Sequence, residues 1–167
     1  MTTPLMACFG ADRFAAFAPV AGLTTFAGCQ PTDPEAILTF HGTDDPILIF
    51  NGGVGDLGVV DGGEAPDDIS VPEADLDGPG YPATAREWAE LLECDPEPTD
   101  EDLTDELIER SWDCPDGSEL TFIIVEGGGH SWPGSEFSKT IADIVGPTTF
   151  DIDATEAMWE MFQRHQL

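Results

Sequence analysis

Residues 119–134 read ELTFIIVEGGGHSWPG, an apolar run followed by three glycines, a histidine and a Trp-Pro pair. The run from 119 to 126 is rich in β-branched residues, which predicts a strand buried on both faces of a sheet. Glycine is entropically costly to order, so three in succession indicate a backbone geometry that other residues cannot adopt. The stretch therefore predicts that the end of a buried strand presents His130 in a defined direction.

Two further apolar runs have the same character. Residues 13–22 (RFAAFAPVAG) and residues 36–41 (AILTFH) are both predicted strands, and the turn-forming sequence GTDDP closes the second. Continuous apolar runs, rather than alternating ones, are typical of strands in a parallel sheet.

Helical patterns lie between and after these runs. Thr84-x-x-Glu87 has the form of a capping box and leads into Trp88, Leu91 and Leu92 at helical spacing. Asp153-x-x-Glu156 starts a second helix, whose apolar stripe we expect to pack in the core; the stripe consists of Met158, Met161 and Phe162.

The remaining segments are predicted to be irregular. Residues 56–82 are rich in Gly, Pro and Asp and are predicted to form a long surface loop. Residues 95–118 are predicted to form an acidic, loop-rich region with a short helix around Leu103 to Ile108. Strands alternating with helices predict an α/β fold with a mostly parallel sheet flanked by helices. A length of 167 residues, without repeats or a linker, predicts a single domain.

The charge of the chain is extreme. Thirty-four Asp and Glu residues face five Lys and Arg residues, for a formal net charge of −29. A field of that sign repels phosphate and anionic lipid, so we expect neither a nucleic-acid partner nor a membrane partner. The acids are interpreted as a solvated surface suited to high salt or high solubility. A calcium site within residues 56–77 is the alternative, although the segment contains no D-x-[DN]-x-[DN]-G loop.

Four cysteines are well separated, and none forms a C-x-x-C motif, which argues against a zinc ribbon or a thioredoxin-type site. Pairing Cys8 with Cys29 and Cys94 with Cys114 would close two local loops and would fit an oxidising compartment. Four buried free thiols are the alternative. The N-terminus has no basic segment followed by a long apolar segment, so the sequence as given shows no signal peptide.

Two predicted strand ends carry side chains that can take part in acid–base chemistry. One delivers Asp44 and Asp45 in the sequence HGTDDP, and the other delivers His130. Reactive groups collect beyond the carboxyl ends of parallel strands, so these side chains are expected at one edge of the sheet. A carboxylate that accepts a hydrogen bond from Nδ1 of a histidine leaves Nε2 free to act as a general base.

The order of these motifs resembles the C-terminal half of a secreted esterase family, the polyhydroxybutyrate depolymerase and feruloyl esterase type of α/β-hydrolase. The matching pieces are DRFAAFAPVAG (12–22), FHGTDDPI (40–47), a Trp88 helix that ends at Cys94, CPDG (114–117), VEGGGHSWPGS (125–135) and DIDATEAMWEMF (151–162). Each piece alone is weak, but together they run in the family's order and cover nearly the whole chain.

The resemblance implies roles for individual residues. His130 matches the catalytic histidine, and Asp45, directly before Pro46, matches the catalytic acid, with Asp44 as the second choice. Trp132 matches an aromatic residue that would wall the substrate site, although it could equally belong to the core. The resemblance also implies an ester substrate such as a polyhydroxyalkanoate or a polysaccharide-linked ester, an extracellular location and no cofactor.

One part of the family's pattern has no counterpart. The nucleophilic serine of the family sits in a G-x-S-x-G-G turn just before the helix that here begins near Pro4, and the sequence contains no G-x-S-x-G. The serines that are present lack the strand–turn–helix context of such a turn: Ser70, Ser111, Ser118, Ser131, Ser135 and Ser138. We therefore expect 1–167 to be a partial α/β-hydrolase domain without its first strands, with little or no esterase activity alone.

Two other hypotheses remain. A metal site formed by His41, Asp45 and His130 is possible, but the sequence has no H-x-x-x-H pair. Otherwise, His41 is expected to bond locally within the loop that carries Asp44 and Asp45, and His165 is expected to lie at the surface. A non-catalytic acidic binding or interaction module derived from an esterase is favoured by the missing serine and disfavoured by the retained acid and histidine.

Overall fold

The computed structural model describes residues 2–10, 12–31, 35–55, 71–115 and 117–165. Its helices are α1 (Thr3–Phe9), α2 (Tyr81–Leu91), α3 (Glu136–Thr140), α4 (Ala142–Val145) and α5 (Ala154–Arg164). Its strands are β1 (Ala16–Phe17), β2 (Ala36–Gly42), β3 (Thr99–Asp102), β4 (Leu107–Trp112) and β5 (Glu119–Val125). The predicted strands at 36–41 and 119–126 correspond to β2 and β5.

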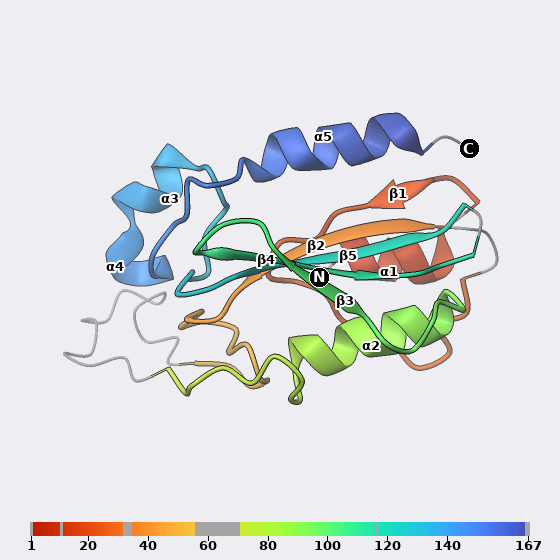
Figure 1. Cartoon of the computed structure of the whole chain (residues 1–167), viewed down its shortest axis with the longest axis horizontal. Helices are drawn as coiled ribbons and strands as arrows, with labels where there is room; N and C mark the ends of the chain where they lie inside the picture. The colour runs from red at the N-terminus through yellow and green to blue at the C-terminus, as the bar shows by residue number, and fades with distance from the viewer. Residues whose placement is uncertain (1, 11, 32–34, 56–70, 116, 166–167) are drawn as a thin grey trace.

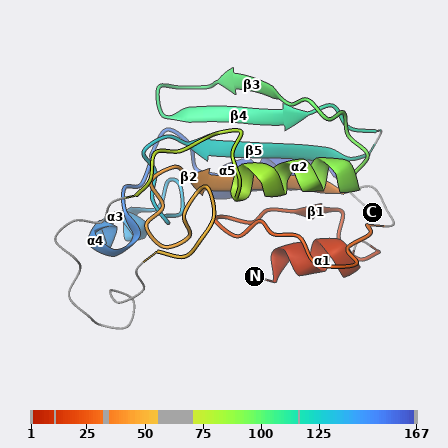
Figure 2. The same ribbon diagram turned by 90° about the horizontal axis from the view of Figure 1, so that it is seen from below.

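The strands form one sheet in the order β1-β2-β5-β4-β3 (Figures 1 and 2). The pairs β1–β2 and β2–β5 are parallel, whereas β5–β4 and β4–β3 are antiparallel. The sheet is therefore mixed, with helices around it. The prediction of a mostly parallel sheet was wrong because it did not include β3 and β4.

The hairpin of β3 and β4 occupies the region that was predicted to be loop and short helix. Residues from Leu103 to Ile108 hold the turn of this hairpin and the start of β4, not a helix. All four side chains of β3 are exposed acids or threonine, so its sequence has no apolar face to reveal it. Arg110 of β4 is buried, and its guanidinium bonds both carboxylate oxygens of Asp100 at 2.7 Å. An ion pair, rather than an apolar contact, therefore links β3 to β4, and hydrophobic periodicity does not reveal such a link.

The first strand is shorter than predicted. Within residues 13–22, only Ala16 and Phe17 form a ladder with β2, followed by an isolated bridge from Val20 to Phe40. Pro19 has no N–H to donate, and Ala21 has a φ of 46°, outside the strand region. These two residues end regular pairing before the apolar run ends.

The two faces of the sheet bury alternate residues of the same strands. On one face, helices α1 and α2 cover β2 and β5 with a core that includes Ile37, Phe122 and Ile124 around Trp88. On the other face, α5 packs against the intervening residues, and Figure 2 shows α5 behind the sheet with α1 and α2 in front. Covering both faces explains why β2 and β5 are continuous apolar runs.

The ends of the two longer helices test the capping predictions. Asp153 caps α5 as predicted, because its Oδ1 accepts hydrogen bonds from the N–H groups of Thr155 at 2.8 Å and Glu156 at 3.1 Å. Met158 and Met161 are buried as expected, but Phe162 is 37% exposed. The stripe on α5 is therefore narrower than the sequence suggested.

Helix α2 begins earlier than the predicted capping box. Its N-cap is Gly80 and a proline occupies its first turn, so Thr84 lies inside the helix and donates to the carbonyl of Gly80. The side chain of Glu87 accepts a hydrogen bond from Thr25 at 2.6 Å instead of returning to the helix backbone. The Tyr-Pro pair that follows Gly80, rather than Thr84, was the correct start signal.

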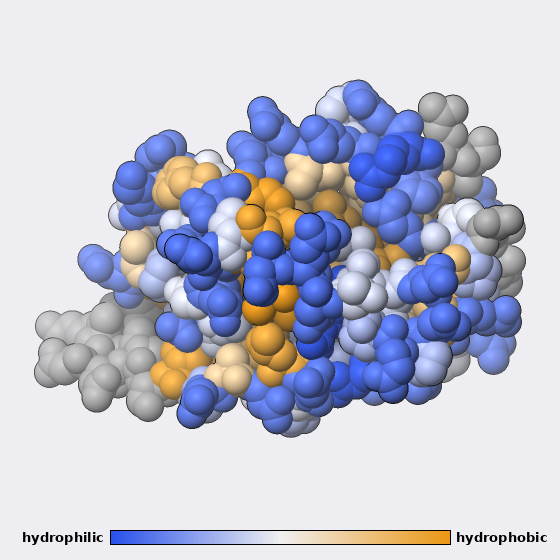
Figure 3. Space-filling view, in the orientation of Figure 1, coloured by the Kyte–Doolittle hydropathy of each residue, from blue (hydrophilic) through white to orange (hydrophobic). Residues whose placement is uncertain are grey.

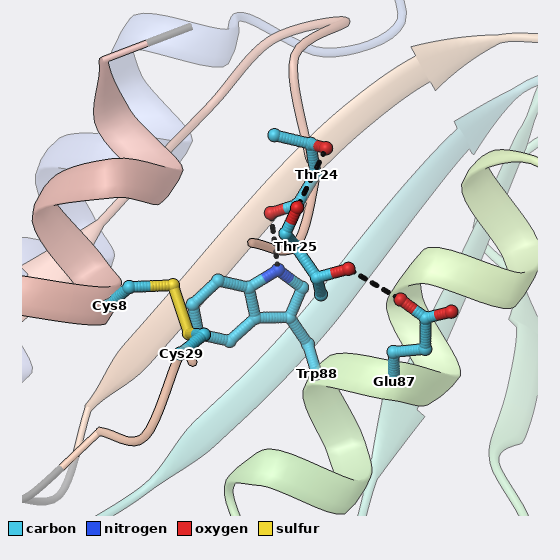
Figure 4. The surroundings of a disulfide bond; sticks show 6 residues. All are labelled: Cys8, Thr24, Thr25, Cys29, Glu87 and Trp88. Carbon is cyan, nitrogen blue, oxygen red and sulfur yellow. Dashed lines mark hydrogen bonds between the residues drawn. A yellow bond between two sulfur atoms is a disulfide. The ribbon is translucent and has the colours of Figure 1, made fainter. Parts of the chain in front are cut away.

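Both predicted disulfides are present. Cys8–Cys29 joins α1 to the loop that follows β1, and Cys94–Cys114 joins the segment after α2 to the segment after β4. Figure 4 shows the first disulfide beside the indole of Trp88, whose Nε1 donates to the carbonyl of Thr24 at 3.1 Å. Two disulfides fit an oxidising environment.

The surface reflects the charge of the sequence. The face in Figure 3 is mostly hydrophilic, with a narrow apolar band between hydrophilic areas. Among the described residues, no helix has the length and apolar character needed to cross a membrane.

Because each disulfide closes a loop of about twenty residues, the chain-entropy model predicts that each contributes about 3 kcal/mol to the free energy of unfolding. We expect replacement of Cys8 and Cys29 by alanine to lower this free energy by about 2–4 kcal/mol. Urea titration of the variant and the parent measures the difference. Replacement of Cys94 and Cys114 gives a second pair for comparison, and an unchanged midpoint in both variants would contradict a stabilising role.

Candidate active site

Two loops meet beyond the carboxyl ends of β2 and β5. These strands are parallel neighbours, and the last residue of β2, Gly42, is paired in register with the last residue of β5, Val125. The chain therefore leaves both strands at the same level of the sheet. Residues 43–48, called the acid loop here, and residues 126–134, called the histidine loop, start side by side.

Hydrogen bonds join the beginnings of these loops. The N–H of Thr43 donates to the carbonyl of Val125, and the N–H of Asp44 donates to the carbonyl of Gly128, both at 2.9 Å. In return, the N–H of Gly127 donates to Oγ1 of Thr43 at 2.8 Å. The strand pairing thus continues into the loops and fixes their separation.

The glycines allow this close approach. A Cβ atom on Gly42 would lie 2.0 Å from the carbonyl oxygen of Gly128, and one on Gly129 would lie 2.1 Å from the carbonyl oxygen of Val145. Gly127 adopts a φ of +67°, in the left-handed region that favours glycine. Gly127 therefore serves a turn, and Gly128 and Gly129 serve close contacts, since a Cβ on Gly128 would lie 2.6 Å from the side chain of Val125. Together they bring His130 back toward the acid loop.

Asp45 lies at the centre of the site and is fully buried. Its Oδ1 accepts hydrogen bonds from the N–H groups of Ile47 and Leu48, both at 2.8 Å. Its Oδ2 lies 2.8 Å from Nδ1 of His130 and 3.3 Å from Nε2 of His41. Burial alone would raise the pKa of Asp45, but hydrogen bonds from His130, His41 and Leu48 outweigh it and hold the pKa well below its usual value.

His130 is oriented by both its side chain and its backbone. Its N–H donates to the carbonyl of Val145, and the preceding N–H of Gly129 donates to the carbonyl of Pro147. An ionised Asp45 can only accept, so Nδ1 of His130 carries a proton, and in the neutral ring the lone pair is on Nε2. The side chain of His130 retains 30% exposure beside the buried carboxylate. This arrangement can accept a proton at Nε2 and stabilise the resulting cation.

The other predicted residues take different places. Asp44 is exposed, and its carboxylate does not share the position of Asp45. Trp132 is 41% exposed, so it is not a core residue; its Nε1 donates to Oγ1 of Thr155 at 3.2 Å. His165 bonds Glu119, the first residue of β5, and therefore lies at the opposite end of that strand from His130.

The expectation that His41 bonds within the acid loop is confirmed by its 2.8 Å contact with the carbonyl of Leu48, whereas Tyr81 carried no prediction. His41 approaches Asp45, and the ring of Tyr81 packs on His41 with the ring centroids 3.6 Å apart. Burial of the phenol and the negative charge of Asp45 raise the pKa of Tyr81 to about 12. The position of His41 four residues before Asp45 was the available signal, but Tyr81 lies too far along the chain to be connected with them.

The metal alternative is weakened by these contacts. Nε2 of His41 lies 2.8 Å from the carbonyl of Leu48, a contact that commits this nitrogen to donating a proton rather than binding a cation. Within the described ranges, no group of three His, Cys, Asp or Glu side chains is arranged to hold a metal ion. Most of the predicted calcium segment, residues 56–70, lies outside the described residues.

The low pKa of Asp45 predicts a pH-dependent contribution to stability. The contribution is complete above the unfolded value of about 3.9 and is lost as the pH falls from there toward the folded value. We expect Asp45→Asn to lower the free energy of unfolding by about 2–3 kcal/mol at pH 7 and by less at pH 3. Urea titrations at both pH values measure this, with the exposed Asp44→Asn as control; equal losses at the two pH values would contradict the assignment.

The contact between the loops predicts a strong effect of one methyl group. We expect Gly42→Ala to lower the free energy of unfolding by about 3 kcal/mol or more, because its Cβ would overlap the carbonyl of Gly128. Gly22→Ala is the control, since a Cβ there meets only the carbonyl of Val20 at 3.4 Å. Thermal unfolding followed by circular dichroism compares the two, and equal melting temperatures would refute the role of this contact.

Comparison with known proteins shows a distant similarity to an esterase. No protein-family model matches the chain. The chain is similar to feruloyl esterase B of Piromyces equi, with 29% identity over 129 residues. The match covers 74% of this chain and 22% of that protein, so the chain spans about a fifth of the relative's length. At this level, the similarity suggests an esterase-related family for the chain.

Proposed function

We propose that these residues form the acid and histidine part of a carboxylic ester hydrolase of the polyhydroxybutyrate depolymerase and feruloyl esterase type. The observation that carries the proposal is the 2.8 Å contact between Oδ2 of Asp45 and Nδ1 of His130. The two residues follow adjacent parallel strands, in the order acid then histidine that α/β-hydrolases use. The distant similarity to a feruloyl esterase points to the same class of reaction.

In the proposed mechanism, His130 moves the protons and Asp45 orients it. Nε2 of His130 accepts the proton of a serine hydroxyl as the oxygen attacks the ester carbonyl. The imidazolium that forms is stabilised by the ionised Asp45, which does not itself take up the proton. His130 then returns the proton to the leaving alkoxide, and a water molecule repeats the sequence to release the acid.

The serine of this mechanism belongs to the proposal as well. Since the 167 residues contain no G-x-S-x-G sequence, we propose that the nucleophile and the oxyanion hole lie outside them and that these residues alone turn over little ester. The exposed Trp132, two residues after His130, is the proposed wall of the substrate site. The substrate class is a polyhydroxyalkanoate or a polysaccharide-linked ester, and the two disulfides support an extracellular location.

The decisive experiment compares two polypeptides from the same gene. The 167-residue chain is expected to hydrolyse a short-chain aryl ester at the background rate. A product extended through an upstream in-frame G-x-S-x-G-G sequence is expected to hydrolyse it, with kcat reduced about 10³-fold or more by His130→Ala. His165→Ala is the matched control and leaves kcat unchanged, because His165 lies at the far end of β5.

A second comparison separates the two adjacent acids. In the extended product, Asp45→Asn is expected to reduce kcat by orders of magnitude, since the amide favours the wrong tautomer of His130. Asp44→Asn is expected to have little effect on kcat. Full activity after either His130→Ala or Asp45→Asn would overturn the proposed mechanism.

A non-catalytic binding or interaction module is the second candidate, favoured by the missing serine sequence. It predicts a stop codon in place of the upstream serine sequence and no labelling of any natural form of the protein by a fluorophosphonate, a reagent that reacts with activated serines. Covalent labelling of an upstream serine would exclude it.

A further inference from the structure

His41 is held in a closed compartment beside the proposed catalytic acid. It lies one residue before the end of β2, beside the start of α2, and is 2% exposed. One face of its ring packs on Tyr81, the first residue of α2, and its edge meets Phe50 with centroids 5.9 Å apart. This packing fixes the plane of the imidazole ring, and the contacts of Nε2 fix its orientation within that plane.

That orientation directs Nε2 at two acceptors of the acid loop. The carbonyl of Leu48 lies 2.8 Å away, and Oδ2 of Asp45 lies 3.3 Å away. A carbonyl and a carboxylate can only accept, so Nε2 carries the ring proton. Nδ1 is buried and has no hydrogen-bond partner among the described residues, which matches a neutral ring with its lone pair on Nδ1.

Leu48 is thereby fixed through both of the peptide groups that flank its Cα. Its N–H donates to Oδ1 of Asp45, and its carbonyl accepts from His41. The first hydrogen bond ties Leu48 to Asp45 within the acid loop, and the second ties Leu48 to His41 of β2. Loss of the second bond would leave the half-buried Leu48 carbonyl without its imidazole donor, a state that favours movement of the loop.

We propose that His41 is a positioning residue, which holds the Leu48 carbonyl and Oδ2 of Asp45 so that the carboxylate stays aimed at Nδ1 of His130. The inference rests on the proposed function, because it assigns His41 a role in the proposed pair of Asp45 and His130. His41 contacts the acid, not the reacting atoms. Its effect reaches His130 only through the acid loop.

The first test uses the wild-type chain and needs no substitution. The sequence contains three histidines, so ¹⁵N labelling of histidine gives three sets of ring signals. Long-range ¹H–¹⁵N correlation spectra distinguish protonated from unprotonated ring nitrogens. We expect His41 to carry its proton on Nε2 and His130 on Nδ1 at neutral pH. A proton on Nδ1 of His41 would overturn the proposal.

The second test removes the donor and then restores it. His41→Phe keeps an aromatic ring against Tyr81 and Phe50 but has no N–H, so the Nδ1–H signal of His130 is expected to move upfield and to be lost through exchange with water. In His41→Gln, the side-chain amide reaches the position of Nε2 and is expected to restore the signal. His165→Gln is the control, because it alters a histidine at the other end of β5.

The outcomes separate a positioning role from simple packing. If His41→Phe folds and retains the wild-type His130 signal, the proposal is wrong; if His41→Phe does not fold, the wild-type spectrum and His41→Gln still decide. A His130 signal that His41→Gln fails to restore in a folded chain also counts against it. Since proton positions are measured rather than turnover, a failure here is distinguishable from a failure to hydrolyse esters.

Discussion

The site depends on the register between β2 and β5. Pairing Gly42 with Val125 makes both strands end at one level, so the two loops begin in hydrogen-bonding contact. A shift of one residue would turn Asp45 or His130 to the other face of the sheet and separate them. Glycine at position 42 permits the contact, because the carbonyl of Gly128 occupies the space of a side chain. The sheet, not the loops themselves, therefore determines the distance between acid and histidine.

Burial of Asp45 is tolerated because hydrogen-bond donors face both of its carboxylate oxygens. Two backbone N–H groups hold one oxygen, and two imidazoles face the other. The chain has 34 Asp and Glu residues, and this carboxylate differs from most of them because it is buried and has donors at both oxygens. In the proposed mechanism, fixed donors around this buried charge need no rearrangement when His130 becomes positively charged.

The sequence predicted those parts of the molecule in which local pattern and tertiary environment agree. The strands β2 and β5 are buried on both faces, Asp153 caps its own helix, and each cysteine pair closes a short loop, so all were visible in the chain. The hairpin of β3 and β4 was missed because one strand is entirely exposed and the other buries Arg110 against Asp100. At the site, the motifs indicated Asp45 and His130, but the partnership of His41 with Tyr81 depends on a contact between residues forty positions apart in the chain. Periodicity carries no information about such contacts.

The disulfides have a consequence for how the chain reaches this structure. Four cysteines allow three pairings, and the native one joins residues only 21 and 20 positions apart. Either alternative would join Cys8 or Cys29 to a cysteine beyond α2, across much longer segments. Because the entropy cost of closing a loop rises with its length, random encounters in the unfolded chain favour the native pairs. Oxidation can therefore precede assembly of the sheet, and the chain needs little reshuffling of bonds to find its correct partners.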